Sequence, residues 1–129
     1  GQPYKDIVAI VGEKEVEKLK QKTFIDYMGY QLTSRFFRSL SLYHPLKEAS
    51  RFQGDVIILH GTNDEDISAE YCLRYDSVFQ TREKGTCEKR LIAGANHTFS
   101  SCVDQRDLFS ETRRWLAAVL KRETRKKVV

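Results

Sequence analysis

The chain has 129 residues, of which 40% are hydrophobic and 31% are charged. That composition is typical of a globular protein with one modest core, since a chain of this size buries roughly two-thirds of its unfolded surface. No hydrophobic run approaches the ~20 residues of a membrane span and no secretory segment is recognisable, so we expect no membrane partner.

The formal net charge of +4 is concentrated at the end of the chain. Residues 121–129 contain five basic residues and one acidic residue, which accounts for the whole net charge. The alternative to a solvated basic tail is an arm that binds nucleic acid or an anionic membrane. No aromatic residues are interleaved with these charges and no groove-reading motif accompanies them. We therefore interpret residues 121–129 as a solvated tail and expect no nucleic-acid partner.

Residues 1–50 are expected to form a mostly helical segment. The hydrophobic run at residues 6–12 fits either a short strand or the start of a helix, because its periodicity does not separate the two. Residues 13–22 have the pattern of an amphipathic helix, and residues 31–42 that of a second one. Pro45 favours the start of a further helical turn. In the helix over residues 31–42, one face is expected to carry four hydrophobic residues: Leu32, Phe36, Phe37 and Leu40.

Residues 51–120 alternate strand and helix patterns. Residues 55–60 are hydrophobic without alternation, which is typical of a parallel strand covered on both faces. A helix is predicted over residues 68–81, a strand over 86–93 and a closing helix over 104–121. This order predicts an α/β fold with a β-α-β-α unit and parallel strands. The closing helix is expected to bury one stripe of residues: Leu108, Trp115, Leu116 and Val119.

An acidic and an imidazole side chain follow the two predicted strands. Asp64 lies just beyond the first strand and His97 just beyond the second, at the edge where open α/β sheets build their sites. An acid followed by a histidine is the second half of a Ser…Asp…His set. Asp66 is the rival acid, although its position before the next helix favours support of the helix dipole. A structural loop is the remaining reading of these residues, and His60 is interpreted as a buried, hydrogen-bonded histidine.

Two motifs carry a family resemblance. Residues 60–68 read His-Gly-Thr-Asn-Asp-Glu-Asp-Ile-Ser, and residues 94–99 read Gly-Ala-Asn-His-Thr-Phe. They resemble the HGxxDxxVP signature and the GADHxF turn that follow the seventh and eighth strands of the α/β-hydrolase fold. Residues 24–46 resemble, more weakly, the cap insertion of bacterial feruloyl or cinnamoyl carboxylesterases. The resemblance covers about residues 20–120, the carboxy-terminal half of such an enzyme. Ser68 replaces the usual Pro, a mild change because Ser caps helices well.

The resemblance implies a serine esterase that forms an acyl-enzyme, with Asp64 and His97 as catalytic residues. No serine of this chain lies in a Gly-x-Ser-x-Gly elbow, and the oxyanion donors of that fold lie in earlier segments. The expected organisation is a cap segment at residues 1–50, a hydrolase part at 51–120 and the basic tail. We therefore expect an inactive fragment that needs no cofactor or metal. Four aromatic residues are candidates for lining the substrate pocket, or alternatively pack between cap helices: Tyr27, Tyr30, Phe36 and Phe37.

The three cysteines, Cys72, Cys87 and Cys102, contain no CxxC pair. Their odd number predicts free thiols and a reducing, cytoplasmic location, although one bridge remains open. Cys102 follows His97 by five residues, so a nucleophilic thiol activated by the His97 imidazole is an alternative. This fold carries its nucleophile before the acid and the histidine, which favours a packed or loop thiol.

Three hypotheses follow for the function. The first is the carboxy-terminal portion of a cap-bearing esterase that acts on a small ester together with an amino-terminal half carrying the nucleophile. The second keeps the fold but changes the reaction, because oligopeptidases have the same Asp and His turns. The third is a non-catalytic half-domain that forms a homo-oligomer through its open sheet edge.

Overall fold

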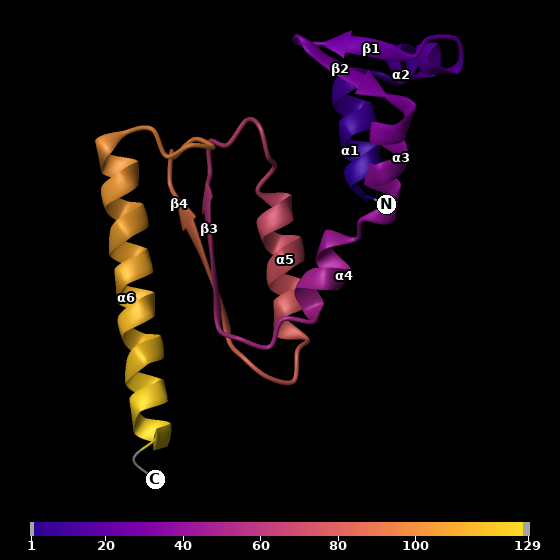
Figure 1. Cartoon of the computed structure of the whole chain (residues 1–129). Coiled ribbons are helices and arrows are strands. Elements are labelled where there is room, and N and C mark those ends of the chain that lie inside the picture. Colours follow the sequence, from indigo (N-terminus) through magenta and orange to yellow (C-terminus); the bar gives the residue numbers. More distant parts are fainter. Residues whose placement is uncertain (1, 128–129) are drawn as a thin grey trace. The chain divides into compact units, whose positions relative to one another are not determined.

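A computed structural model describes residues 2–127 of the chain, which divides into two compact units between Pro45 and Leu46. The division falls slightly before the predicted boundary at residue 50, and the functional roles assigned to the segments stay predictions. Within residues 2–127, no helix combines the length and the hydrophobicity needed to cross a membrane. Figure 1 shows the helices and strands of each unit.

The first unit combines short helices with a β-hairpin. Its elements are α1 (Gln2–Val11), α2 (Glu13–Glu17), the 3-10 helix η1 (Lys18–Lys20), β1 (Phe24–Tyr27), β2 (Tyr30–Thr33) and α3 (Ser34–Leu42). The ambiguous run at residues 6–12 is therefore helical up to Val11. The hairpin pairs β1 and β2 antiparallel and turns at Met28 and Gly29, which both have positive φ, 51° and 85°. Positive φ at both central residues is what a two-residue hairpin turn of type I′ requires.

The hairpin corrects one predicted boundary. The helix expected over residues 31–42 begins only at Ser34, because residues 31–33 pair with β1 instead. The Thr33 hydroxyl accepts a hydrogen bond from the Phe36 amide at 3.2 Å and so caps the helix. Ile25 of the hairpin and Phe37 of the helix are both buried. Ile25 and Phe37 are thus the buried hydrophobic residues in the described part of the first unit, and the Phe37 ring packs against the Tyr4 ring of α1.

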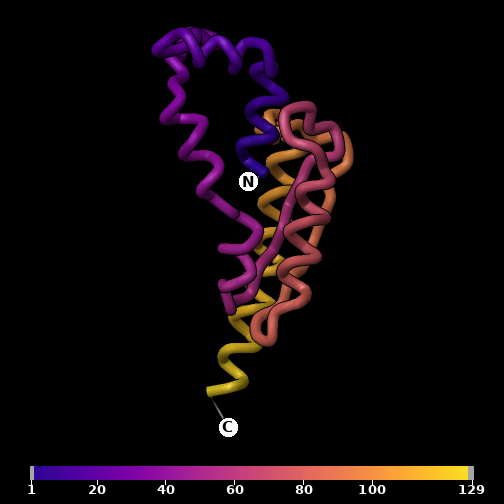
Figure 2. The backbone as a smooth tube through the Cα atoms, turned by 90° about the vertical axis from the view of Figure 1, so that its right-hand side faces the viewer, coloured from indigo at the N-terminus to yellow at the C-terminus, as the bar shows by residue number. Residues whose placement is uncertain are grey.

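The second unit is a parallel strand pair with helices on both faces. Its elements are α4 (Pro45–Ser50, starting at the unit boundary), β3 (Val56–Gly61), α5 (Glu70–Gln80), β4 (Cys87–Ile92) and α6 (Cys102–Lys127). The register runs from Val56 opposite Cys87 to Gly61 opposite Ile92. The strands lie between α5 and α6 in Figure 1, and Figure 2 follows the same backbone from the side. The predicted β-α-β-α unit with parallel strands is confirmed.

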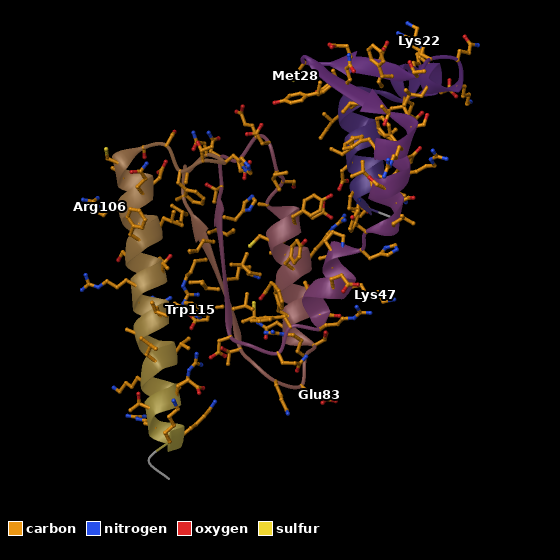
Figure 3. All side chains as sticks on the ribbon, in the orientation of Figure 1. Lys22, Met28, Lys47, Glu83, Arg106 and Trp115 are labelled. Carbon is orange, nitrogen blue, oxygen red and sulfur yellow. The ribbon has the colours of Figure 1, made fainter. Side chains whose placement is uncertain are left out.

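Alternate residues of β4 contact the two helices. Lys89 forms an ion pair with Asp76 of α5 at 2.6 Å, whereas Glu88 faces Arg114 of α6 at 3.3 Å. Trp115 lies on the side of α6 that faces the sheet, and Arg106 projects from the helix on another side (Figure 3). The two faces of β4 therefore contact different helices, α5 on one side and α6 on the other.

Three details of the second unit differ from prediction. Helix α5 begins at Glu70, although the Ser68 hydroxyl still accepts a hydrogen bond from the Glu70 amide at 3.2 Å. Helix α6 continues to Lys127, so the described part of the basic tail is helical. Leu116 is 47% exposed instead of buried, because it follows Trp115 by one residue and is therefore turned about 100° around the helix.

Hydrogen bonds tie together the amino-terminal ends of the two strands. The Asp55 carboxylate accepts bonds from the amide and the hydroxyl of Thr86, at 2.8 and 2.7 Å. The Arg82 guanidinium donates to the carbonyls of Gly54, at 2.9 Å, of Thr86, at 3.3 Å, and of Phe52. These bonds fix the strands at the end of the sheet opposite to the candidate site.

Candidate active site

The carboxyl ends of β3 and β4 release two loops that bind each other. The Thr62 amide donates to the Ile92 carbonyl, and the Asn63 amide donates to the Ala95 carbonyl, both at 3.0 Å. The Gly94 amide returns a bond to the Thr62 hydroxyl at 2.8 Å. Because parallel strands end at the same edge, the loop of Asp64 and the loop of His97 are held side by side.

Gly61 makes this close approach possible. A Cβ atom at residue 61 would lie only 2.1 Å from the Ala95 carbonyl oxygen, and Ala95 is fully buried. Gly94 has a φ of 75°, a conformation that favours glycine, at the turn that follows β4. Glycine thus fits both motif positions for structural reasons: residue 61 has no space for a Cβ atom, and residue 94 has a positive φ.

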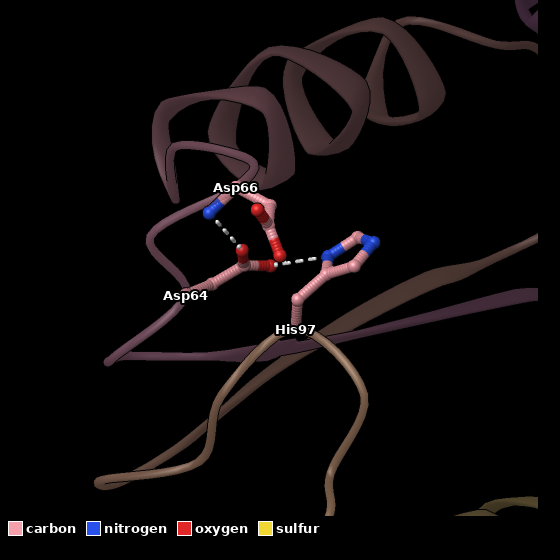
Figure 4. Close-up of side chains that lie close together, drawn as sticks. All are labelled: Asp64, Asp66 and His97. Carbon is pink, nitrogen blue, oxygen red and sulfur yellow. Dashed lines mark hydrogen bonds and ion pairs between the residues drawn. The ribbon is translucent and has the colours of Figure 1, made fainter. Parts of the chain in front are cut away.

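Asp64 is oriented by the backbone of its own loop. Its Oδ1 atom accepts hydrogen bonds from the amides of Asp66, at 3.0 Å, and Ile67, at 2.8 Å. Its Oδ2 atom lies 3.0 Å from Nδ1 of His97 (Figure 4). The Asp64 side chain is only 5% exposed. The carboxylate is therefore sheltered and has one oxygen directed at the imidazole.

His97 is open on its other side. Its side chain is 48% exposed, and within the described part of the chain Nε2 has no hydrogen-bond partner. The Asn96 side chain shapes the loop, because Oδ1 accepts from the Ser100 amide at 3.1 Å and Nδ2 donates to the Ser100 hydroxyl at 2.7 Å. Phe99 adopts a φ of 50° in the same turn. The loop thus presents His97 with one nitrogen held and one free.

Each of these two side chains shifts the proton affinity of the other. Removal of the Asp64 carboxylate from water opposes its ionisation, but hydrogen bonds from Ile67 and His97 outweigh this and lower the pKa of Asp64. The hydrogen bond with Asp64, helped by its negative charge, raises the pKa of His97. The pair therefore favours carboxylate beside imidazolium, the charge state that a general base reaches after taking a proton.

A shallow cleft of about 310 Å³ lies beside the His97 ring. It is lined by Asn63, Glu65, Asp66, Asn96, His97 and Thr98. These residues are all polar, and the cleft gives room for water or a reacting group next to the His97 side chain. The arrangement can accept a proton at Nε2 while Asp64 stabilises the resulting charge at Nδ1.

Asp64, Asp66 and His97 also offer possible metal-ligand atoms within 4.8 Å of one another. Both oxygens of Asp64, however, already accept hydrogen bonds from protein groups. That donor set fits a hydrogen-bonded acid–base pair, and we interpret the cluster in this way.

The structure brings together two of the predicted site residues, Asp64 and His97. The rival acid Asp66 contributes its backbone amide to Asp64, and among residues 2–127 Asp64 is the acid hydrogen-bonded to the His97 ring. Cys102 begins α6, and no hydrogen bond joins it to His97 in the same residues. The catalytic roles themselves stay predictions.

The four predicted substrate-binding residues belong to the first unit. Tyr27 and Phe36 are half-buried, Tyr30 is 71% exposed and Phe37 is buried. The Phe37 ring meets the rings of Phe36 and Tyr4 edge-to-face, with centroids 5.3 and 6.4 Å apart. Phe37 thus contributes to the core of its unit, and the role of all four in substrate binding stays a prediction.

His60 is the residue whose part in the site the sequence analysis missed. The sequence predicts a buried, hydrogen-bonded histidine, and the 3.0 Å distance from Nε2 to the Ile67 carbonyl agrees with this. The sequence does not predict that the same Nε2 lies 3.4 Å from Oδ2 of Asp64. The available signal was its position, which is the end of a strand and four residues before the acid.

Comparison with known proteins agrees with the fold. Residues 1–123 match the prolyl oligopeptidase family. No curated protein sequence matches the chain significantly. The structure is similar to that of Est1E from Butyrivibrio proteoclasticus, with a TM-score of 0.61 and 17% sequence identity over 77% of this chain.

The chain spans 38% of the length of Est1E. This similarity confirms a partial α/β-hydrolase fold, and the family match supports a serine hydrolase type. This family is that of the oligopeptidases, whose reaction is the second hypothesis drawn from the sequence. Since the match extends over nearly the whole sequence, the chain belongs to the prolyl oligopeptidase family.

Proposed function

We propose that this chain is the carboxy-terminal portion of a serine hydrolase that cleaves carboxylic esters through an acyl-enzyme. In this proposal the chain supplies the acid, Asp64, and the base, His97, of a Ser-His-Asp triad. The supporting observation is the 3.0 Å contact between Asp64 Oδ2 and His97 Nδ1, which leaves Nε2 free, together with the open cleft that the His97 side chain lines.

The proposed chemistry follows from the two nitrogens of His97. Nε2 takes the proton of a serine hydroxyl while the serine oxygen forms a bond to the ester carbonyl carbon. Asp64 stabilises the imidazolium that results. The same proton then passes to the departing alkoxide as the carbon–oxygen bond of the ester breaks. Water repeats the sequence on the acyl-enzyme, which releases the acid and restores the serine.

The nucleophile of this proposal lies outside residues 1–129. None of the nine serines is flanked as in Gly-x-Ser-x-Gly, and the strained elbow that exposes a nucleophilic hydroxyl needs those glycines. We therefore propose an amino-terminal half as the partner and expect the 129-residue chain alone to be inactive. The strand β3 pairs only with β4 in the described residues. Its other edge is available to that half or, alternatively, to a second copy of this chain.

Peptide hydrolysis is the second candidate reaction, and the family match favours it. The same Asp64–His97 pair serves either reaction, because an amide nitrogen leaving group needs the same proton as an alkoxide. The resemblance of residues 24–46 to the cap of esterases is what favours ester hydrolysis. The three cysteines of the structure are free thiols, which supports the proposed cytoplasmic location.

A kinetic comparison on protein isolated with its co-purifying polypeptides tests this proposal. We expect hydrolysis of a p-nitrophenyl ester that exceeds hydrolysis of a peptide p-nitroanilide, and a loss of turnover on the order of 10^4 in Asp64→Asn. The matched control is Asp107→Asn, an exposed aspartate on α6, which should leave turnover unchanged. Preferential peptide cleavage would establish the second reaction, and activity that survives Asp64→Asn would exclude the proposed triad.

A further inference from the structure

A second imidazole lies against the Asp64 carboxylate. His60 is at the end of β3, and its side chain is 12% exposed. Its Nε2 lies 3.0 Å from the Ile67 carbonyl oxygen and 3.4 Å from Oδ2 of Asp64. Oδ2 is the same oxygen that His97 contacts. Two imidazoles therefore lie close to the same carboxylate oxygen.

The partners of His60 fix its tautomer. A carbonyl oxygen can only accept a hydrogen bond, so the Nε2 of His60 must carry the proton and donate it. The Asp64 oxygen lies close to the same N–H group and can take a share of that bond. The N–H group of His60 thus points toward the Ile67 carbonyl and the Asp64 carboxylate. In this tautomer the ring can hold the loop in place by donating a hydrogen bond.

The bonds around Ile67 close the loop into a ring. The Ile67 amide donates to Oδ1 of Asp64 at 2.8 Å, and its carbonyl accepts from His60 at 3.0 Å. Ile67, in the segment between β3 and α5, is therefore held through both its amide and its carbonyl. Loss of the His60 bond would free the Ile67 carbonyl and loosen the amide that orients Asp64.

We propose that His60 is a positioning residue of the candidate active site. It holds the loop of residues 61–67 so that Oδ2 of Asp64 faces Nδ1 of His97. This inference rests on the proposed function only insofar as Asp64 and His97 form its acid–base pair. His60 contacts Ile67 and Asp64 and is not among the residues that line the cleft, so it does not touch the reacting groups.

The test is the NMR titration of the His97 ring in the full chain, which has only three histidines and can be assigned by substitution. In His60→Leu we expect the His97 pKa to fall, in the same direction as in Asp64→Asn but by less. In His60→Gln we expect it to stay near the wild-type value, because the glutamine amide reaches about as far as Nε2 and can donate. The control is His44→Gln, an exposed position in the first unit, which should leave the titration unchanged.

A second pair of variants covers the case in which His60→Leu does not fold. His60→Asn is polar but too short to reach the Ile67 carbonyl, so it should lower the His97 pKa where His60→Gln does not. An unchanged His97 pKa in all folded variants would overturn the inference. A rise would overturn it too, because it would mean that His60 competes with His97 for Asp64.

The titration also separates this inference from the proposed function. It needs no enzymatic activity, so an inactive protein would leave the His60 result intact. If Asp64→Asn lowers the His97 pKa and the His60 variants do not, the acid–base pair stands without His60. In the active protein, His60→Leu should lower kcat with little effect on KM, since it disturbs proton transfer and not binding.

Discussion

At the scale of single residues, we expect the distance between Asp64 and His97 to depend on Gly61, which has no side chain. Gly61→Ala would place a methyl group 2.1 Å from the Ala95 carbonyl oxygen. We expect the free energy of unfolding to fall by about 1–3 kcal/mol, as in other overpacked sites, and the His97 pKa to fall as the two loops separate. Denaturant unfolding and NMR titration measure the two effects.

Ala93→Ser is the control for that substitution. It also adds one heavy atom, but at an exposed position in the turn after β4. We expect it to change neither quantity measurably. Equal effects of the two variants would mean that Gly61 does not set the loop distance.

The Asp64–His97 bond predicts a pH-dependent contribution to stability. Because Asp64 raises the pKa of folded His97, the bond stabilises the fold fully below the unfolded value of about 6.5. This contribution disappears as the pH rises through the folded pKa. The stability difference between wild type and Asp64→Asn should therefore be larger at about pH 5.5 than at about pH 9. Asp66→Asn, which removes only a more distant charge, should show a smaller difference.

The sequence was sufficient to predict Asp64 and His97, because both follow strands and parallel strands end at one edge of a sheet. The role of His60 was not predictable in the same way. Its contact with the Ile67 carbonyl depends on how the loop folds back onto the strand end. Such a contact is a property of the three-dimensional loop and leaves no spacing signal of its own.

At the scale of elements, the strands and helices of residues 51–120 were predictable and the hairpin of the first unit was not. Hydrophobic runs between turn residues mark β3 and β4 clearly. In contrast, Leu32 fits the helical face of the residues that follow it, so the pattern extended the helix into β2. The Met28-Gly29 turn was the local signal that a hairpin intervenes.

The Arg82 side chain is expected to stabilise the strand pair. Arg82→Met removes donors from the carbonyls of Phe52, Gly54 and Thr86. The Thr86 carbonyl keeps its bond from the Val56 amide at 2.8 Å, but the Phe52 and Gly54 carbonyls lose this donor, which should cost about 1–3 kcal/mol in the free energy of unfolding. In contrast, Arg51→Met breaks only an exposed ion pair with Glu48 and should cost less than about 1 kcal/mol. A similar cost for the two variants in denaturant unfolding would contradict this role.

The interface between α5 and β4 should protect Cys87 from alkylation. Burial, together with the charge and the hydrogen bond of Asp76, raises the pKa of the Cys87 thiol to about 11. Cys72 is buried on α5, and burial raises its pKa too. Cys102 is exposed at the start of α6. Iodoacetamide at neutral pH should therefore modify Cys102 first, as read by peptide mass.

Unfolding in urea is the control, because it should make the three thiols react at similar rates. Modification of Cys87 in the native chain as fast as that of Cys102 would contradict the protected interface.

At the scale of the whole molecule, the second unit has the surface of a part of a larger sheet. Among the described residues, β3 pairs on one edge only, and hydrophobic side chains stay exposed on β4 and on α6: Leu91, Phe109, Leu116 and Leu120. An open strand edge and exposed hydrophobic side chains are each typical of interaction surfaces. This agrees with the 38% of Est1E that the chain spans.

The measurement that tests the central claim most directly is labelling with a fluorophosphonate serine probe, followed by intact mass determination under denaturing conditions. The protein is isolated from its source with whatever polypeptides accompany it. We predict that residues 1–129 gain no mass, and that a serine outside them is labelled. Label on one of the nine serines of this chain, or the absence of label on every polypeptide, would contradict a triad that Asp64 and His97 complete for a serine elsewhere.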